Sequence, residues 1–526
     1  MSNYKEYTVT TKSLEATDSV WEDLLSLSGS DTIPSRVVEV ANAREVSSYN
    51  TVYFLTDEEA IKLKQDPRVV EVQDLNMLSM NHCAFQDSLF DKVNTSTGAR
   101  SNWGLLRHVS ATNIFGTGTG DPGGTYDYVL DGTGVDVVIV DSGIQADHPE
   151  FLNYAGTESR VKQINWFTAS GVSGTMSANF YTDYHGHGTH VAATVAGRTF
   201  GWAKNADIYV IKLDGLKGFG DPSTGLSTAD TFDCIQAWHT QKMTGAGNRR
   251  PTIVNNSWGY SFYWHENLNS VSFSSLSSGT MYSITSQYYR GLTYSTNVKD
   301  TARGTTGAPY GDGVWQMPYR VSAVDADVNS IVNAGVIVCN AAGNQYSKID
   351  VVGGVDYYNY VLAGGFGFYY NQGSSPQGTF GSVLTVGSAG ASVVGALDRK
   401  TNFSNSGPAV NIYGIGDRVM SAGLNANSQI GTPADYYFNP SFKQISIGGT
   451  SMASPQIAGL AALVAQAHPD WTPRQIVGWL FNNAKPEMYN TGLDNDYNVT
   501  SSIHGGYNKL AYFPMNARKN YQIVAS

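Results

Sequence analysis

Three residues far apart in the sequence have side chains suited to nucleophilic catalysis: Asp141, His187 and Ser451. A serine hydroxyl is a weak nucleophile near neutral pH. It needs a base to take its proton and a third group to orient that base. A histidine and an aspartate can supply these two roles. The trio therefore predicts acyl transfer, in which the serine attacks a carbonyl carbon.

Ser451 lies in the segment 449–455 (Gly-Thr-Ser-Met-Ala-Ser-Pro), which opens an apolar stretch that predicts a buried helix to about residue 468. Proline is tolerated only in the first turn of a helix, so Pro455 places Ser451 at or just before the helix N-terminus. The unpaired N–H groups there stabilise negative charge near the hydroxyl. Ordinary N-capping explains the same pattern, so this segment alone leaves both interpretations of Ser451 open. Ser454 is interpreted as a capping residue.

The other two candidates stand beside predicted elements of one sheet. The apolar run 135–140 predicts a buried strand, and Asp141 follows at its carboxyl end, where open α/β sheets place their active sites. His187 lies among glycines that lead into a helix of small residues. Beyond Trp103, short apolar runs alternate with helical segments, which predicts an α/β fold with a parallel sheet and helices on both faces. The expected strands are 208–213, 252–256, 336–341 and 383–386, and the expected helices include 227–238 and 321–334.

The chain divides into several parts in sequence. Residues 1–80 predict a small α+β (ferredoxin-like) unit in the order βαββαβ, whose second helix opens with a capping box at Thr56 and Glu59. Residues 81–100 predict a linker, and 101–526 the main unit. Two stretches rich in glycine and tyrosine, at about 261–317 and 346–381, are too long for ordinary loops and are interpreted as insertions.

Composition narrows the classes of partner. The 526 residues carry a net charge of −11, which argues against a phosphate-binding surface and so against nucleic acid as a partner. The three cysteines, Cys83, Cys234 and Cys339, lie far apart and imply no disulfide framework; Cys234 and Cys339 are expected to be buried. We find no apolar run long enough for a membrane span and no signal-peptide pattern, so a soluble chain is expected.

Several segments resemble signature blocks of the subtilisin-like serine proteases (subtilases). Segments 140–144, 187–192 and 449–455 resemble the three blocks of that family that carry the aspartate, the histidine and the serine. The order Asp, His, Ser is that of subtilisin, the established example of it. Segments 103–105, 198–204 and 506–512 resemble the proteinase K branch in particular.

The resemblance implies further site residues. Segment 341–344 resembles the oxyanion block of the family, which implies that the Asn344 side chain donates to the tetrahedral intermediate. Segment 256–259 resembles one wall of the specificity pocket. We expect two short segments to offer edge backbone to an extended substrate: Gly218, Phe219 and Gly220, and Ser257, Trp258 and Gly259.

Residues 1–80 resemble the inhibitory propeptide of the family. The resemblance implies a zymogen that processes itself within about 78–100, and a serine endopeptidase that needs no cofactor for its chemistry. Its implied partners are polypeptide substrates and its own propeptide. The insertion after Gly259 begins at the expected wall of the specificity pocket, so the sequence does not predict the side-chain preference.

Three places in the sequence invite a metal-binding interpretation. His185, His187 and His190 suggest zinc, but their spacing is irregular for ligands on a helix and no cysteine lies near. Asp398 aligns with a calcium-binding carboxylate of the proteinase K branch, which implies a structural calcium ion; a solvated loop charge is the alternative. Glu150 stands where many subtilisins carry a calcium ligand, but the loop that completes that site is missing, so no calcium is predicted there.

Two alternatives to a secreted, active protease stay open. The first is a non-catalytic subtilase fold that keeps its propeptide and serves as a structural component of a larger particle, such as a virion. The second is an intracellular protease, which suits the lack of disulfides. An extracellular or particle-associated location is favoured over a cytoplasmic one.

Overall fold

The computed structural model describes residues 4–26, 29–42, 50–74, 89–92, 99–245, 249–264, 314–363, 366–490 and 502–514, and the short segments 270–272, 281–282, 288–289 and 292–295. The chain forms two compact units, one small and N-terminal and one large. Among the described residues, no helix has both the length and the apolar character needed to cross a membrane.

The N-terminal unit has the predicted βαββαβ order. Its elements are β1 (Lys5–Thr11), α1 (Leu14–Leu25), β2 (Val40–Asn42), β3 (Asn50–Leu55), α2 (Asp57–Leu63) and β4 (Val69–Asp74). The strands form one antiparallel sheet in the order β2-β3-β1-β4. Thr56 and Glu59 form the predicted capping box at the start of α2. Val9, Val20, Leu24, Tyr53 and Leu63 are among the side chains that fill the core of this unit.

A large sheet organises the second unit. Its strands are β5 (Asp136–Asp141), β6 (Val161–Lys162), β7 (Asp207–Lys212), β8 (Thr252–Asn256), β15 (Ile337–Ala341), β18 (Leu384–Val394), β19 (Leu397–Lys400) and β20 (Ile412–Ile415). Their order is β19-β18-β15-β8-β5-β7-β6, with β20 also paired to β18. Every pair is parallel except β18 with β19. The predicted α/β class with a mostly parallel sheet is confirmed.

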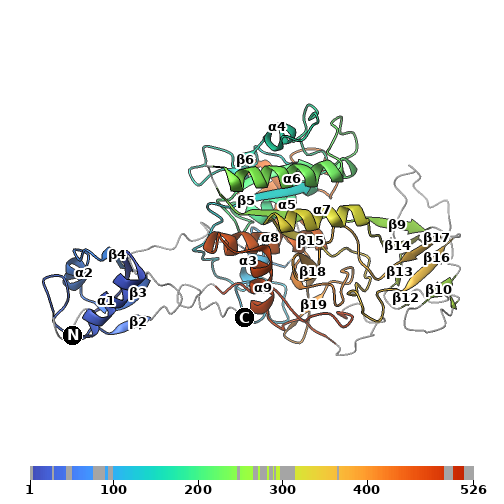
Figure 1. Ribbon diagram of the computed structural model, residues 1–526. Helices are drawn as coiled ribbons and strands as arrows, with labels where there is room; N and C mark the ends of the chain where they lie inside the picture. Colours follow the sequence, from blue (N-terminus) through green and yellow to red (C-terminus); the bar gives the residue numbers. More distant parts are fainter. Residues whose placement is uncertain are drawn as a thin grey trace. The chain divides into compact units, whose positions relative to one another are not determined.

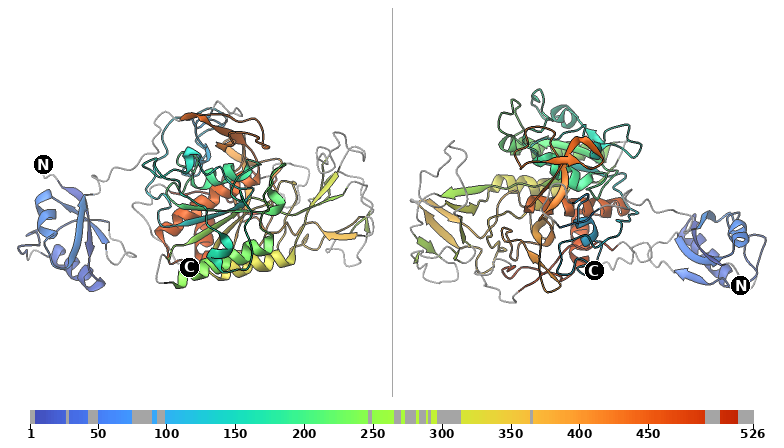
Figure 2. Two further views of the ribbon diagram at one scale, coloured as in Figure 1. Left: turned by 90° about the horizontal axis from the view of Figure 1, so that it is seen from above. Right: turned by 180° about the vertical axis from the view of Figure 1, so that it is seen from behind.

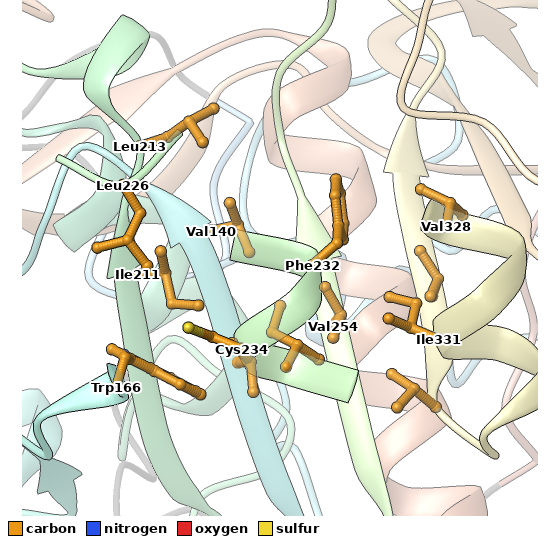
Figure 3. Packing of buried hydrophobic residues seen from close by; sticks show 14 of the residues in the cluster. Val140, Trp166, Ile211, Leu213, Leu226, Phe232, Cys234, Val254, Val328 and Ile331 are labelled. Atoms are coloured by element: carbon orange, nitrogen blue, oxygen red, sulfur yellow. The ribbon is translucent and has the colours of Figure 1, made fainter. Parts of the chain in front are cut away.

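Helices cover both faces of this sheet (Figure 1). They are α4 (Trp166–Ser170), α6 (Thr228–Thr244) and α7 (Ser322–Asn333) on one face, and α5 (His187–Ala196) and α8 (Thr450–Ala467) on the other, together with α3 (Gly104–Arg107) and α9 (Pro473–Asn483). Figure 3 shows Val140 and Ile211 of the sheet packed near Phe232 and Cys234 of α6. Cys234 and Cys339 are fully buried, as expected.

Both predicted insertions contain small antiparallel sheets. The first holds β9 (Ser261–Trp264), β10 (Ser270–Ser272), β11 (Met281–Tyr282), β12 (Tyr288–Tyr289), β13 (Leu292–Ser295) and β14 (Val314–Pro318), and the second β16 (Tyr360–Ala363) and β17 (Phe366–Tyr369). Their sheet orders are β12-β13-β14-β9 and β11-β10-β16-β17, so the second sheet joins the two insertions. The two sheets lie side by side at one end of the large unit (Figures 1 and 2). A third small sheet contains β21 (Val419–Gly423), β22 (Ala434–Tyr436) and β23 (Asn439–Ile447).

Part of the predicted linker is built into the large unit. Phe90 and Lys92 are fully buried. The Lys92 ammonium donates to the Ala391 carbonyl at 3.1 Å and lies 5.0 Å from the centre of the Trp103 ring. Residues 89–92 are therefore not a free connection, although they were included in the predicted linker.

Candidate active site

Asp141 and His187 are paired as the predicted chemistry requires. Asp141 is the last residue of β5 and is buried, and His187 is the first residue of α5. The Nδ1 atom of His187 lies 2.8 and 3.0 Å from the two carboxylate oxygens of Asp141. Burial alone lowers the pKa of His187, but the charge and hydrogen bond of Asp141 outweigh it, so the pKa lies above 6.5.

Asp183 holds the start of α5 in position. Its carboxylate accepts hydrogen bonds from the backbone N–H groups of His185, Gly186 and Thr189, at 2.9, 2.9 and 3.0 Å, and from the hydroxyl of Ser142. Several of these N–H groups have no partner within the helix, so the carboxylate acts as a cap. The Ser142 hydroxyl in turn accepts from Gly188 N–H. This network fixes the histidine helix to the end of the aspartate strand.

Gly188 allows the close approach of α5 to β5. A Cβ atom on Gly188 would lie 2.2 Å from the Gly143 carbonyl oxygen. Gly143 itself has φ +118°, which a side chain would strain. The two glycines are therefore required by the geometry that brings His187 to Asp141.

Ser451 is the second residue of α8, as predicted, but the role of Pro455 differs from the expectation. Pro455 is the sixth helical residue and so lies beyond the first turn. Since proline has no N–H, it leaves the Ser451 carbonyl without its helical partner. The Ser257 hydroxyl donates to that carbonyl at 2.9 Å, and the Ser451 hydroxyl donates to the Ser257 carbonyl at the same distance.

Ser454 is not the capping residue that the sequence suggested. It lies inside α8, fully buried, and its hydroxyl donates to the Asn255 side-chain oxygen at 2.8 Å. The Asn255 amide donates to the Ser257 hydroxyl at 2.9 Å. Ser454 and Asn255 therefore orient Ser257, which contacts the candidate nucleophile.

Asn344 lies at the carboxyl end of β15, next to the turn before Ser451. Its side-chain oxygen accepts from the backbone N–H and the hydroxyl of Thr450, at 2.9 and 2.8 Å. Asn344 is exposed, and a Cβ atom on Gly449 would lie 3.6 Å from its amide nitrogen. Buried Asn405 fixes the loop from behind: its side chain accepts from Gln345 and Ser347 N–H and donates to the Ala342 carbonyl.

The first predicted substrate segment is a turn. Asp221 N–H donates to the Gly218 carbonyl at 3.1 Å, and Gly220 has φ +79°, as the third residue of a type II turn requires. The Phe219 side chain stands at its tip and is 94% exposed. The turn follows β7, which pairs with the Asp141 strand. Substrate binding by Gly218, Phe219 and Gly220 stays a prediction.

The second predicted substrate segment follows β8. Ser257 and Trp258 are buried, Trp258 as part of the core under α6 and α7, whereas Gly259 is exposed. Tyr260 N–H donates to the Ser375 carbonyl, so the chain beyond Gly259 is bonded to the second insertion before it enters β9. Gly259 is the exposed residue of this segment, and substrate binding by Ser257, Trp258 and Gly259 stays a prediction.

The surroundings of Asp398 do not fit a calcium ion. Its carboxylate is fully buried, and one of its oxygens lies 2.8 Å from both Nε and Nη2 of Arg107. A calcium ion needs several oxygen ligands, and the guanidinium would repel it. Glu150 is also engaged, accepting from Tyr436 and from the N–H groups of Thr199 and Phe200. Within the described ranges, no three His, Cys, Asp or Glu side chains gather as a metal-binding group.

The three histidines of the zinc interpretation have separate surroundings. His190 is buried, and its Nε2 lies 3.1 Å from the Val419 carbonyl oxygen; burial lowers its pKa to about 3. His187 is paired with Asp141, and the His185 ring lies 6.1 Å from the His187 ring.

Sequence reasoning missed the residues that hold the site together. The positioning contacts described above come from four residues that were not among the predicted site residues: Asp183, Asn255, Asn405 and Thr450. Asp183 had one available signal, since an acid four residues before a predicted helix start can cap it. The other three act across long sequence separations, which a pattern does not show.

A parallel α/β sheet with an Asp–His pair and a serine at a helix start defines a hydrolase of the subtilisin class. Residues 132–505 match the profile of the Subtilase family, so the chain belongs to that family. It is a subtilisin-like serine endopeptidase.

The chain is also similar to several named proteases. The chain is 25% identical over 432 residues to the extracellular serine proteinase of Thermus sp. (strain Rt41A), covering 82% of this chain and 70% of that one. It is 24% identical over 492 residues to the cuticle-degrading protease of Metarhizium anisopliae, covering 93% and 87%. Proteinase R of Parengyodontium album is 26% identical over 363 residues, covering 68% and 59%. A solved cold-adapted subtilisin-like serine proteinase is 23% identical, with a TM-score of 0.45 over 79% of this chain and 98% of that one.

Proposed function

We propose that Asp141, His187 and Ser451 form the catalytic triad of an endopeptidase that cleaves polypeptides through an acyl-enzyme. The observation that carries the proposal is the bidentate approach of the Asp141 carboxylate to His187 Nδ1, at 2.8 and 3.0 Å. This contact leaves Nε2 of the neutral imidazole as the proton acceptor.

The reaction begins when the Ser451 hydroxyl leaves the Ser257 carbonyl by rotation about its Cα–Cβ bond. His187 Nε2 takes the hydroxyl proton as the oxygen attacks the peptide carbonyl, and Asp141 stabilises the imidazolium. The Asn344 amide and the Ser451 N–H donate to the resulting oxyanion. His187 then protonates the leaving amine. In deacylation, His187 takes a proton from water as the water oxygen attacks the acyl carbonyl, and it returns that proton to Ser451 as the acyl group leaves.

The N-terminal unit is proposed as an inhibitory propeptide that the enzyme removes itself. Residues 89–92 are packed within the large unit, so we place the processing cut before Leu89, in the earlier part of the predicted window. A structural calcium ion at Asp398 is not part of the proposal, because Arg107 already neutralises that carboxylate. Export to the extracellular space is proposed from the kind of relatives the chain has.

Self-processing is tested by incubating the purified full chain beside its Ser451→Ala variant and measuring fragment masses over time. We expect the wild-type chain to yield a fragment that begins between about residues 78 and 89, and the variant to stay whole. An identical cut in both chains would reject self-processing. An uncut wild-type chain that still hydrolyses peptides would reject the self-processing zymogen but not the peptidase activity.

A further inference from the structure

A pocket of about 330 Å³ lies beside β18, the strand next to β15 in the large sheet. It is lined by Gly390 and Ser392 of β18, Arg399 and Lys400 of β19, the segment 401–403, and Asp417. These residues belong neither to the proposed triad nor to the predicted substrate segments. The volume is within the range of ligand pockets, and most of the lining side chains are polar or charged, so a polar group suits the pocket better than an apolar one.

The pocket and the predicted wall of the specificity pocket lie on opposite sides of Asn344. In the sheet order β18-β15-β8, β8 leads into the wall at 257–259, β15 leads into Asn344, and β18 lines the pocket. Because these strands are parallel, their carboxyl ends lie at the same edge of the sheet. A substrate whose acyl part lies along 257–259 therefore directs its leaving-group part toward the pocket.

Two contacts place the pocket close to the reacting groups. A Cβ atom on Gly448, in the turn that precedes the candidate nucleophile, would lie 3.4 Å from Asp417 Oδ1. The Tyr346 N–H, just beyond the candidate oxyanion donor, donates to the Phe403 carbonyl at 2.8 Å. The pocket thus adjoins both the nucleophile turn and the oxyanion loop, within reach of a substrate side chain near the cleaved bond.

Arg399 supplies the pocket with a charge that no other side chain neutralises. It is half-buried, and within the described ranges its side chain makes no hydrogen bond, ion pair or ring contact. The carboxylate of the pocket is engaged, since Asp417 Oδ2 accepts from Ala391 N–H at 3.1 Å. The Lys92 ammonium donates to the Ala391 carbonyl, and Arg418 donates to the Lys92 carbonyl, so two cations offset the charge of Asp417.

We infer that Arg399 is a specificity-determining residue that binds an acidic side chain of the substrate on the leaving-group side of the cleaved bond. A guanidinium presents its N–H donors in a planar fork that matches a carboxylate, and such charge-assisted hydrogen bonds are stronger than those of a neutral amide. Partial burial strengthens the attraction, because less solvent screens it. This inference rests on the proposed peptidase function and names the substrate class for the same site.

The test uses the full chain and pairs of internally quenched peptides that differ only by glutamate or glutamine at one position, scanned through the first three positions after the cleaved bond. Fragment masses confirm the bond that is cut. We expect one position at which glutamate is preferred by about 10-fold or more in kcat/KM. The Arg399→Gln variant should bring that ratio close to one, and Arg399→Glu should reverse it. The control Arg474→Gln, at an exposed position of α9, should keep the wild-type ratio.

Each outcome has a distinct meaning. A wild-type chain that cleaves the peptides without preference for glutamate at any position overturns the inference alone, as does a preference that survives in both Arg399 variants. Loss of the preference in Arg474→Gln also overturns it, because the effect would then come from the overall charge of the chain. A reversed preference in Arg399→Glu supports the inference, since a misfolded variant would lose activity on both peptides. Cleavage of none of the peptides by the wild type overturns the proposed function, and this inference with it.

Discussion

Substitution of Asn344 by alanine removes one of the two proposed oxyanion donors. The Asn344 side-chain oxygen is held by two hydrogen bonds from Thr450, of 2.9 and 2.8 Å, so the orientation of its amide is fixed before substrate binds. Loss of one preorganised donor typically lowers kcat by about 10²–10³, or about 2.7–4 kcal/mol of transition-state stabilisation. KM should change little, because this hydrogen bond strengthens as the oxyanion forms.

Two variants of Thr450 test the orientation separately from the donor. The Thr450 hydroxyl donates to Asn344 and also accepts from Gly343 N–H at 3.1 Å. Thr450→Val removes both of these hydroxyl contacts but keeps the Asn344 amide, and we expect kcat to fall by about 5-fold, the scale of one net hydrogen bond of about 1 kcal/mol. Thr450→Ser keeps the hydroxyl and should retain kcat.

Steady-state hydrolysis of one peptide by all four enzymes gives the comparison. A raised KM with unchanged kcat in Asn344→Ala would refute the oxyanion role of Asn344, because that pattern indicates an interaction made with the bound substrate and not only with the transition state. Equal kcat values in Thr450→Val and wild type would refute the orienting role.

Three further predictions follow from other contacts. The kcat/KM of the wild type should fall as the pH drops through a value above 6.5, because His187 must be neutral to act as a base. In Asp141→Asn the supporting charge is lost while burial still lowers the His187 pKa, so this fall in kcat/KM should move to lower pH. The kcat of Asp141→Asn should also drop by about 10⁴. A pH–rate profile in which the fall in kcat/KM stays in place would contradict the pairing. The Ser257→Ala substitution is best made in a Ser451→Ala chain, which cannot digest itself. It removes the donor to the backbone carbonyl at position 451 and should lower the free energy of unfolding by about 1–3 kcal/mol in urea titrations. Unchanged stability would show that another donor satisfies this carbonyl. Arg107→Ala strands the buried Asp398 carboxylate and should cost about 3–5 kcal/mol, whereas a mild effect together with strong destabilisation of the wild type by a calcium chelator would favour a metal at Asp398.

Local patterns in the sequence predicted most of the helices and strands named in advance. The apolar run predicted as a strand at 252–256 coincides with β8, and the predicted capping box of Thr56 and Glu59 opens α2. These features depend on neighbours within a few residues, where propensity and capping act directly. The positions of Asp141 and Ser451 followed for the same reason, since each depends on the end of one element.

Contacts between distant segments were not accessible in this way. Arg107 and Asp398 are 291 residues apart, and nothing in the Asp398 segment indicates that a guanidinium neutralises it. Pro455 lies past the first turn of α8 and not within it, and its effect, a carbonyl freed for the Ser257 hydroxyl, depends on a residue 194 positions away. Gln429 lies in a polar loop without a motif, so only the fold reveals that its side chain bonds the Phe219 backbone.

Fluorophosphonate labelling followed by peptide mass analysis tests the central claim most directly, because the reagent reacts with a serine that its own active site activates. We predict one adduct, on the fragment that contains Ser451, which is lost in Ser451→Ala and strongly reduced in His187→Ala. A folded, uncut chain without any adduct, or an adduct that persists in Ser451→Ala, would contradict the assignment of Ser451 as the nucleophile.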